Sequence, residues 1–74
     1  MAKVALTPET CLEVIRAHFD VVGAPAHDPL ELEQFVIQRV QARKRNKLLK
    51  GDLIRVETLK DWGNKFIEER TEYR

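Results

Sequence analysis

The fold is decided by residues 28–40, whose sequence is DPLELEQFVIQRV. Asp28 is a good helix cap, Pro29 suits the first helical position, and Glu31 is placed to reach back as in a capping box. The apolar residues that follow recur at helical spacing and cover more than half of the helix circumference: Leu32, Phe35, Val36, Ile37 and Val40. This stretch therefore predicts a helix that begins at residue 29, and its wide apolar surface predicts that it is the central, most buried element.

A second helix start lies upstream, at Thr7, Pro8 and Glu9. It combines a hydroxyl cap, a proline at the first helical position and an acid facing the positive end of the helix dipole. Apolar residues then recur at helical spacing at Leu12, Ile15, Phe19 and Val22. Gly23 can adopt the left-handed conformation that closes a helix. The pattern predicts a helix over residues 8–22.

The rest of the chain predicts one more helix. We expect the second helix to run to residue 49 and to stop at Gly51, and a third, with Val56, Leu59, Trp62 and Phe66 on one side, to span residues 56–72. A hairpin around residues 50–52 is the alternative. The apolar residues Leu53 and Ile54 are adjacent, however, whereas a hairpin strand is expected to alternate apolar and polar residues. A chain of 74 residues supports one core. The prediction is an all-α single domain, residues 1–74, with helices at about 8–22, 29–49 and 56–72.

Composition narrows the cellular setting. Cys11 is the only cysteine, so no disulfide forms within one chain and a reducing cytoplasm is expected. Residues 1–6 are too short and too weakly apolar for a signal peptide, and no stretch approaches the length of a membrane span. We therefore expect a cytoplasmic protein with no membrane partner.

Groups suited to catalysis or metal binding are few. Cys11 and His18 lie seven residues apart on the first predicted helix, a spacing compatible with a thiolate pair or two metal ligands. A structural zinc needs two further ligands, so packing roles are favoured for both residues, and a solvated loop position for His27. The carboxylates are dispersed and no glycine-rich phosphate loop occurs. The sequence predicts no enzyme, no metal, no cofactor and no small-molecule substrate.

The middle of the chain is strongly basic. Residues 1–37 carry two basic and six acidic side chains, whereas residues 38–60 carry eight basic and two acidic ones. The helical stripe that begins with Leu32 and Val36 continues in cations, which predicts a basic ridge that contacts DNA or RNA phosphates. The candidate nucleic-acid-binding residues are Arg39, Arg43, Lys44, Arg45, Lys47 and Lys50. A solvated helix face is the alternative.

The positions of the aromatic residues limit which part of a nucleic acid the basic ridge is expected to contact. Phe19, Phe35, Trp62 and Phe66 fall on apolar helix faces, so stacking platforms for single strands are not supported. No helix-turn-helix is convincing, which limits sequence-specific binding. Contacts to the sugar–phosphate backbone are what remains.

Residues 44–68 run from a basic stretch through Leu48-Leu49-Lys50-Gly51-Asp52-Leu53-Ile54 into Val56, Leu59, Trp62 and Phe66. This segment resembles part of the small subunits of phage terminases, where a long helix ends in a Lys-Gly-acid-Leu-aliphatic turn and enters a second amphipathic helix. In that family the helical hairpin serves self-assembly. The sequence departs from the family in having no recognisable winged helix before the hairpin, and Arg55 stands where a cap-like residue is expected. The resemblance implies oligomerisation and a DNA-linked role.

A surplus of apolar residues indicates a second kind of function. Three short helices cannot cover every apolar position, so part of this surface is expected to meet a protein partner or another copy of the chain. The candidate protein-interface residues are Trp62, Phe66 and Tyr73; Trp62 as a core residue is the alternative. The leading hypothesis is a non-catalytic, oligomeric, nucleic-acid-associated module of the kind small phage proteins provide. The competing one is a protein-binding adaptor, assembly factor or inhibitor.

Overall fold

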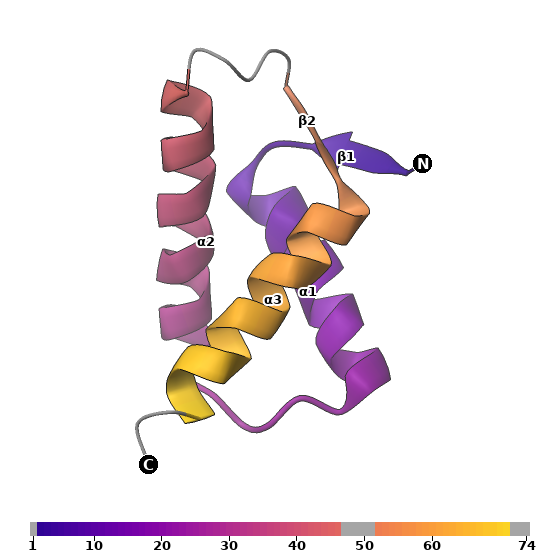
Figure 1. Cartoon of the computed structure of the whole chain (residues 1–74), viewed down its shortest axis with the longest axis vertical. Coiled ribbons are helices and arrows are strands. Elements are labelled where there is room, and N and C mark those ends of the chain that lie inside the picture. The colour runs from indigo at the N-terminus through magenta and orange to yellow at the C-terminus, as the bar shows by residue number, and fades with distance from the viewer. Residues whose placement is uncertain (1, 47–51, 72–74) are drawn as a thin grey trace.

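The chain forms three helices and two short strands, as a computed structural model that describes residues 2–46 and 52–71 shows (Figure 1). Their order is β1 (Lys3–Ala5), α1 (Pro8–Val22), α2 (Pro29–Arg45), β2 (Leu53–Arg55) and α3 (Val56–Thr71). The predicted three-helix domain is confirmed. The two strands, which pair into a small sheet, were not predicted.

Both predicted helix starts are confirmed, each with its expected cap. The Oγ1 atom of Thr7 accepts a hydrogen bond from the backbone N–H of Thr10 at 3.2 Å, and the Oδ1 atom of Asp28 accepts one from Leu30 at 2.9 Å. Gly23 ends α1 in the left-handed conformation with φ of 67°. These starts follow from local chemistry, since the caps satisfy N–H groups that the first turn of a helix leaves without partners.

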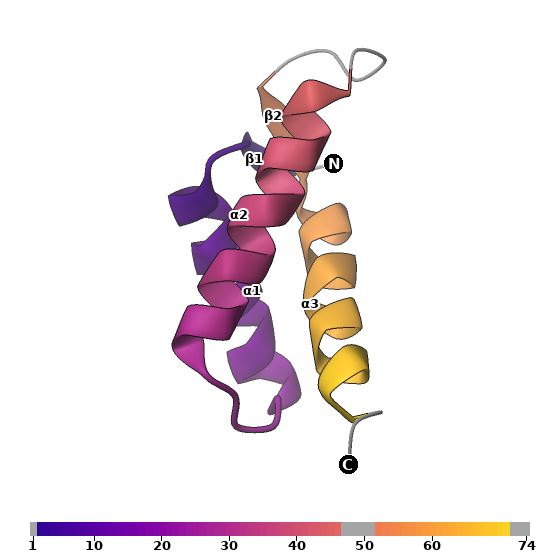
Figure 2. The same ribbon diagram turned by 90° about the vertical axis from the view of Figure 1, so that its left-hand side faces the viewer.

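The central helix is α1, and the prediction that α2 is the central element is wrong. α1 packs extensively against both other helices, whereas α2 and α3 contact each other at few residues. Figure 1 shows α2 and α3 diverging toward the top, and Figure 2 shows α2 in front, with α1 to the left and α3 to the right. α2 buries only Leu32, Val36 and Val40. Of its other large apolar side chains, Phe35 and Ile37 are half-buried and Leu30 is exposed.

One compact core joins all five elements. Its buried residues are Leu6, Cys11, Leu12, Ile15, Phe19, Leu32, Val36, Val40, Ile54, Leu59, Trp62 and Phe66. Gly63 sets the approach of α1 and α3, because a Cβ atom at this position would lie 2.9 Å from the ring of Phe19. The glycine on the apolar face of α3 therefore permits a close approach of α1.

The sheet joins the N-terminal segment to the start of α3. β1 and β2 are antiparallel, with Lys3 opposite Arg55, Val4 opposite Ile54 and Ala5 opposite Leu53. Ile54 is fully buried and Val4 half-buried, whereas the other four strand side chains are exposed. The sheet therefore has one face on the core and one face on the surface.

α2 ends at Arg45, four residues before the predicted end at residue 49. Asn46 already has an extended backbone, with φ of −77° and ψ of 108°. Val40 is the last buried residue of α2, and the turn beyond it, with Arg43, Lys44 and Arg45, adds no buried side chain to the core. The predicted stop at Gly51 and the alternative hairpin fall on residues 47–51, outside the described residues, as does the predicted end of the third helix at residue 72.

Candidate nucleic-acid interface

The structure describes four of the six predicted nucleic-acid-binding residues, all of them on α2. Arg39 and Arg43 lie four residues apart on one side of α2 and are half-buried. Lys44 and Arg45 are exposed, and each successive residue turns by about 100° around the helix, so they point in other directions. Arg39 and Arg43 therefore share one side of α2, and Lys44 and Arg45 extend the positive charge around the helix end. Lys47 and Lys50 lie outside the described residues.

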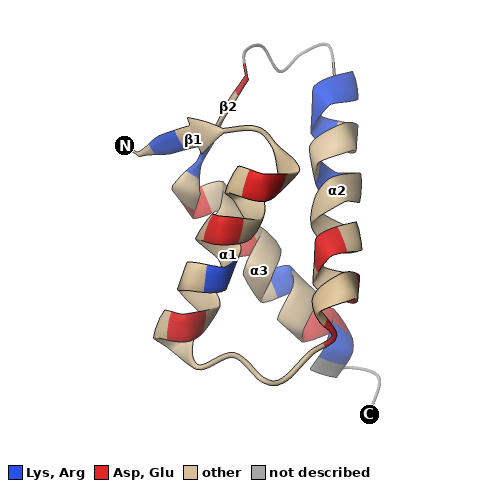
Figure 3. Cartoon of the chain, turned by 180° about the vertical axis from the view of Figure 1, so that it is seen from behind, with Lys and Arg blue, Asp and Glu red and all other residues tan. Residues whose placement is uncertain are grey.

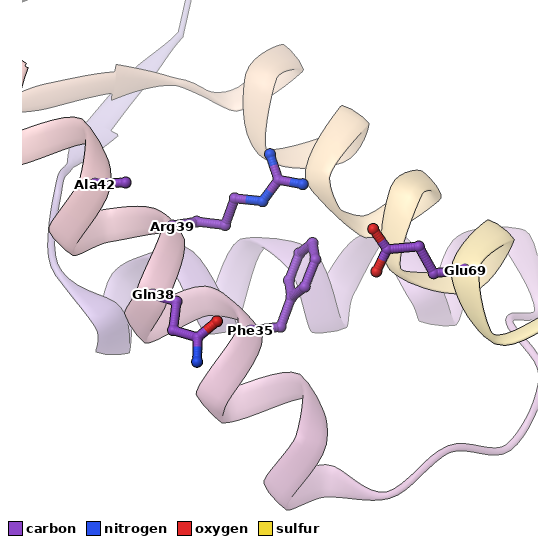
Figure 4. A pocket seen from close by; sticks show the side chains of 5 residues that line it. All are labelled: Phe35, Gln38, Arg39, Ala42 and Glu69. Atoms are coloured by element: carbon purple, nitrogen blue, oxygen red, sulfur yellow. The ribbon is translucent and has the colours of Figure 1, made fainter.

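Arg39 belongs to the space between α2 and α3. Its guanidinium carbon lies 4.9 Å from the centre of the Phe35 ring, which is the geometry of a cation–π contact. The two side chains line a surface depression of about 440 Å³ together with Gln38, Ala42 and Glu69 (Figure 4). Arg39 extends toward α3 in this view, and the carboxylate of Glu69 points into the same depression. Arg39 is thus already engaged in packing and is less available to an external phosphate.

The remaining three cations form what we call the basic helix end, namely Arg43, Lys44 and Arg45. The sequence of α2 has no acidic residue after Glu33. Among residues 2–46 and 52–71, ion pairs join Arg70 to Glu31 and Glu69, and none involves the basic helix end. In Figure 3 the blue of Lys and Arg marks the ribbon at this end of α2. This end of the helix therefore carries unneutralised positive charge on a largely exposed turn.

The field of these cations reaches the first turn of α1. Burial raises the pKa of the Cys11 thiol above its ordinary value of 9.0. A hydrogen bond with the backbone of Thr7 and the positive charges of Arg43 and Lys44 lower this pKa, but by less than burial raises it. The thiol of Cys11 is fully buried. Cys11 is therefore a neutral core side chain beside the basic helix end, and its surroundings do not favour a thiolate.

The two histidines have packing partners of their own. The Nε2 atom of His18 lies 3.1 Å from Oδ1 of Asn64 on α3. His27 contacts the backbone oxygen of Pro25 at 3.1 Å and presents its ring edge-on to Phe19 and Phe66. Within the described part of the chain, no group of three or more His, Cys, Asp or Glu side chains is arranged to hold a metal ion.

The predicted protein-interface residues lie in the core where they are described. Trp62 is 7% exposed and Phe66 is 0% exposed, so the structure favours the alternative that Trp62 is a core residue. Tyr73 lies outside the described residues. The large apolar side chains that are exposed lie elsewhere, at Val21, Val22, Leu30 and Leu53. Apolar contact with a partner would therefore use the ends of α1 and α2 or the sheet.

The sheet adds Lys3 to the cations that the charge pattern of the sequence grouped together, since Arg55 already belongs to the basic middle of the chain, residues 38–60. Lys3 falls in the acidic first half of the chain, yet pairing of β1 with β2 places it opposite Arg55. Both side chains are exposed, at the same end of the molecule as the basic helix end (Figures 1 and 3). Strands of three residues give almost no periodic signal, so the sequence offers no means of finding this pair.

Comparisons of the chain with protein-family models, curated proteins and solved structures gave no match. The implied kinship with terminase small subunits stays a prediction. No helix in the described part of the chain is long and apolar enough to cross a membrane.

Proposed function

We propose that this protein binds the sugar–phosphate backbone of nucleic acid, without catalysis, through the basic helix end of α2. The observation that carries the proposal is the cluster of three cations on one helix turn with no acidic partner among the described residues: Lys44 and Arg45 are exposed and Arg43 is half-buried. Guanidinium and ammonium groups are the usual ligands of backbone phosphates.

Compensation of the helix dipole is a weaker explanation for these three charges. Cations at the carboxyl end of a helix do offset its partial negative charge. However, α1 has no basic residue in its last turn and α3 has only Arg70 in its last turn, so helices of this fold form with one such cation or none. Three cations in the last turn of α2 exceed what the dipole requires.

The expected contact is with phosphates and not with bases. Phe19, Trp62 and Phe66 are buried, and the half-buried ring of Phe35 is covered by Arg39. No described aromatic ring is therefore free to stack on a base. Binding through phosphates alone is insensitive to base sequence and depends steeply on salt, because each contact releases condensed counterions.

The test is fluorescence anisotropy with a labelled duplex of arbitrary sequence. Three phosphate contacts predict that affinity falls about fortyfold between 50 and 200 mM salt, since each contact adds about −0.9 to the slope of log K against log salt. The variant Lys44→Glu plus Arg45→Glu, which changes two exposed residues, should bind weakly and lose most of this slope.

A matched control is available on the other helices. Arg16 of α1 and Lys65 of α3 are exposed, and their double replacement by glutamate changes the net charge by the same amount. If the control variant lost as much affinity as the variant at the basic helix end, the binding would reflect net charge alone. No binding of the unmodified protein at 50 mM salt would refute the proposal.

A protein-binding role is the second candidate, and one observation favours it. Val21 is 84% exposed and the adjacent Val22 is 53% exposed, at the end of α1. Exposed neighbouring apolar side chains of this size are candidates for contact with another copy of the chain or with another protein. Light scattering across a range of protein concentrations tests self-association, and capture from a nuclease-treated extract tests binding of other proteins.

A further inference from the structure

The exposed face of the small sheet pairs two like charges. Val4 and Ile54 point toward the core, so the surface side of the sheet is formed by Lys3, Ala5, Leu53 and Arg55. Lys3 stands directly opposite Arg55 in the register. Within the described part of the chain, neither cation has an ion-pair partner.

The hydrogen-bond pattern brings these two side chains especially close. The backbone N–H of Leu6 donates to the carbonyl of Asp52 at 2.7 Å, and that of Val56 donates to the carbonyl of Ala2 at 3.1 Å. Bonded pairs alternate along an antiparallel ladder, so Lys3 and Arg55 form a non-hydrogen-bonded pair, the type with the shorter separation, about 4.5 Å between Cα atoms. Like charges directly opposite each other in such a pair destabilise the sheet.

An anion between the two side chains removes this repulsion. A phosphate oxygen accepts hydrogen bonds from an ammonium and a guanidinium at once, so a pair that is unfavourable when empty becomes favourable when a phosphate is bound. The sheet lies at the same end of the molecule as the basic helix end in both side views (Figures 1 and 2). The ribbons of β1 and of the end of α2 lie on opposite sides of the view in Figure 3.

We propose that Lys3 and Arg55 form a second phosphate-binding point, so that the protein contacts a nucleic-acid duplex through the sheet face as well as through the end of α2. This inference rests on the proposed function and extends it. A duplex carries phosphates on two rigid backbones, which suits two separate positive groups, and no described aromatic ring is free to stack on the bases of a single strand.

The deciding variant is Lys3→Glu, because it should raise the stability of the fold while lowering the affinity for a duplex. A glutamate opposite Arg55 replaces repulsion by attraction, so the melting temperature should rise. The same change removes a phosphate contact and adds an anion, so duplex affinity at 50 mM salt should fall about tenfold, and the salt slope should fall by about one contact. Lys3→Arg keeps the cation and should keep both the affinity and the melting temperature.

Two further variants complete the test. Lys65→Glu on α3 makes the same charge change on an exposed site away from the sheet and should leave affinity within about twofold. Arg55→Gln, with folding checked by circular dichroism, should weaken binding in the same way as Lys3→Glu. A glutamate at residue 3 also preserves a charged strand edge, so a loss of affinity cannot be ascribed to edge-to-edge aggregation.

The outcomes separate this inference from the proposed function. If Lys3→Glu and Arg55→Gln bind the duplex as tightly as the unmodified protein while Lys44→Glu plus Arg45→Glu does not, the sheet face is not a phosphate site and only the inference fails. If the unmodified protein does not bind, the proposed function fails. A binding loss in Lys3→Glu together with a raised melting temperature supports the inference, because a purely structural role moves stability alone.

Discussion

Replacing Gly63 by alanine tests the contact that brings α1 and α3 together. Inside a helix, alanine is more favourable than glycine by about 1 kcal/mol. The new Cβ atom would lie 2.9 Å from Cε1 of Phe19 and 3.4 Å from Cγ2 of Ile15, so one of them must move. Phe19 is 6% exposed, and its ring is flanked by His27 and Phe66 with centroids at 5.1 and 6.4 Å, so it has little room to give.

The steric cost should exceed the gain in helix propensity. Adding a methyl group to a filled core costs about 1–3 kcal/mol. Subtracting the propensity gain leaves a net loss of about 1 kcal/mol in the free energy of unfolding, which lowers the melting temperature of a domain of this size by about 4–8 °C. Urea unfolding followed by circular dichroism at pH 7 gives this difference directly.

The steric clash between a Cβ atom at residue 63 and the ring of Phe19 can be tested separately in a Phe19→Leu variant. Phe19→Leu removes the Cε1 atom, so Gly63→Ala made in that background should stabilise the protein, by up to the full helix-propensity gain of about 1 kcal/mol. The sign of the alanine effect thus depends on the residue at position 19. If Gly63→Ala raised the stability of the unmodified protein by that amount, the argued close contact between α1 and α3 would be refuted.

Two further predictions concern the start of α1. Thr7→Ala removes the side-chain oxygen that accepts a hydrogen bond from the backbone N–H of Thr10, and it should lower the free energy of unfolding by about 1 kcal/mol. Thr7→Ser keeps a hydroxyl at this position and should keep most of that stability. Equal losses of stability for the two variants in urea unfolding would contradict the capping role. The raised pKa of Cys11 keeps the folded thiol neutral where the unfolded thiol ionises, so stability should decline as the pH rises above 9.0. Cys11→Ala should lack this decline, so its free energy of unfolding should depend less on pH above 9.0. An equal pH dependence in the variant and the unmodified protein would contradict this role of Cys11.

The parts of the fold that local chemistry controls were predictable. Thr7-Pro8 and Asp28-Pro29 mark helix starts because the signals lie within a few residues of the backbone groups they satisfy. Gly23 ends α1 for an equally local reason. The end of α2 was predicted too late, since the basic turn after Val40 has helical spacing but no buried side chain to stabilise it.

The parts that depend on distant contacts were not predictable. β1 pairs with a strand roughly fifty residues away, and three-residue strands carry no usable periodicity. Lys3 therefore joined the positive end of the molecule only when the register was known. Which helix is central was equally hidden, because the apolar width of α2 says nothing of how far α3 leans from it.

The candidate site was predictable in composition and not in arrangement. The sequence identified the cations of α2, and charge pattern alone suffices for that. It could not separate Arg39, which lies over Phe35, from Arg43, Lys44 and Arg45. Trp62 is a large side chain on an apolar face in either a core or an interface, so its 7% exposure had to come from the structure.

The pairing of β1 with β2 also has a consequence for how the chain acquires its structure. β1 is synthesised before all three helices, yet its partner emerges only after α1 and α2 are complete. Closing a loop of roughly fifty residues costs about 2 kcal/mol more entropy than closing a four-residue turn, so contacts between the neighbouring helices α1 and α2 form first. A strand made early in synthesis is therefore among the last segments to reach its native position, and it does so together with the first turn of α3.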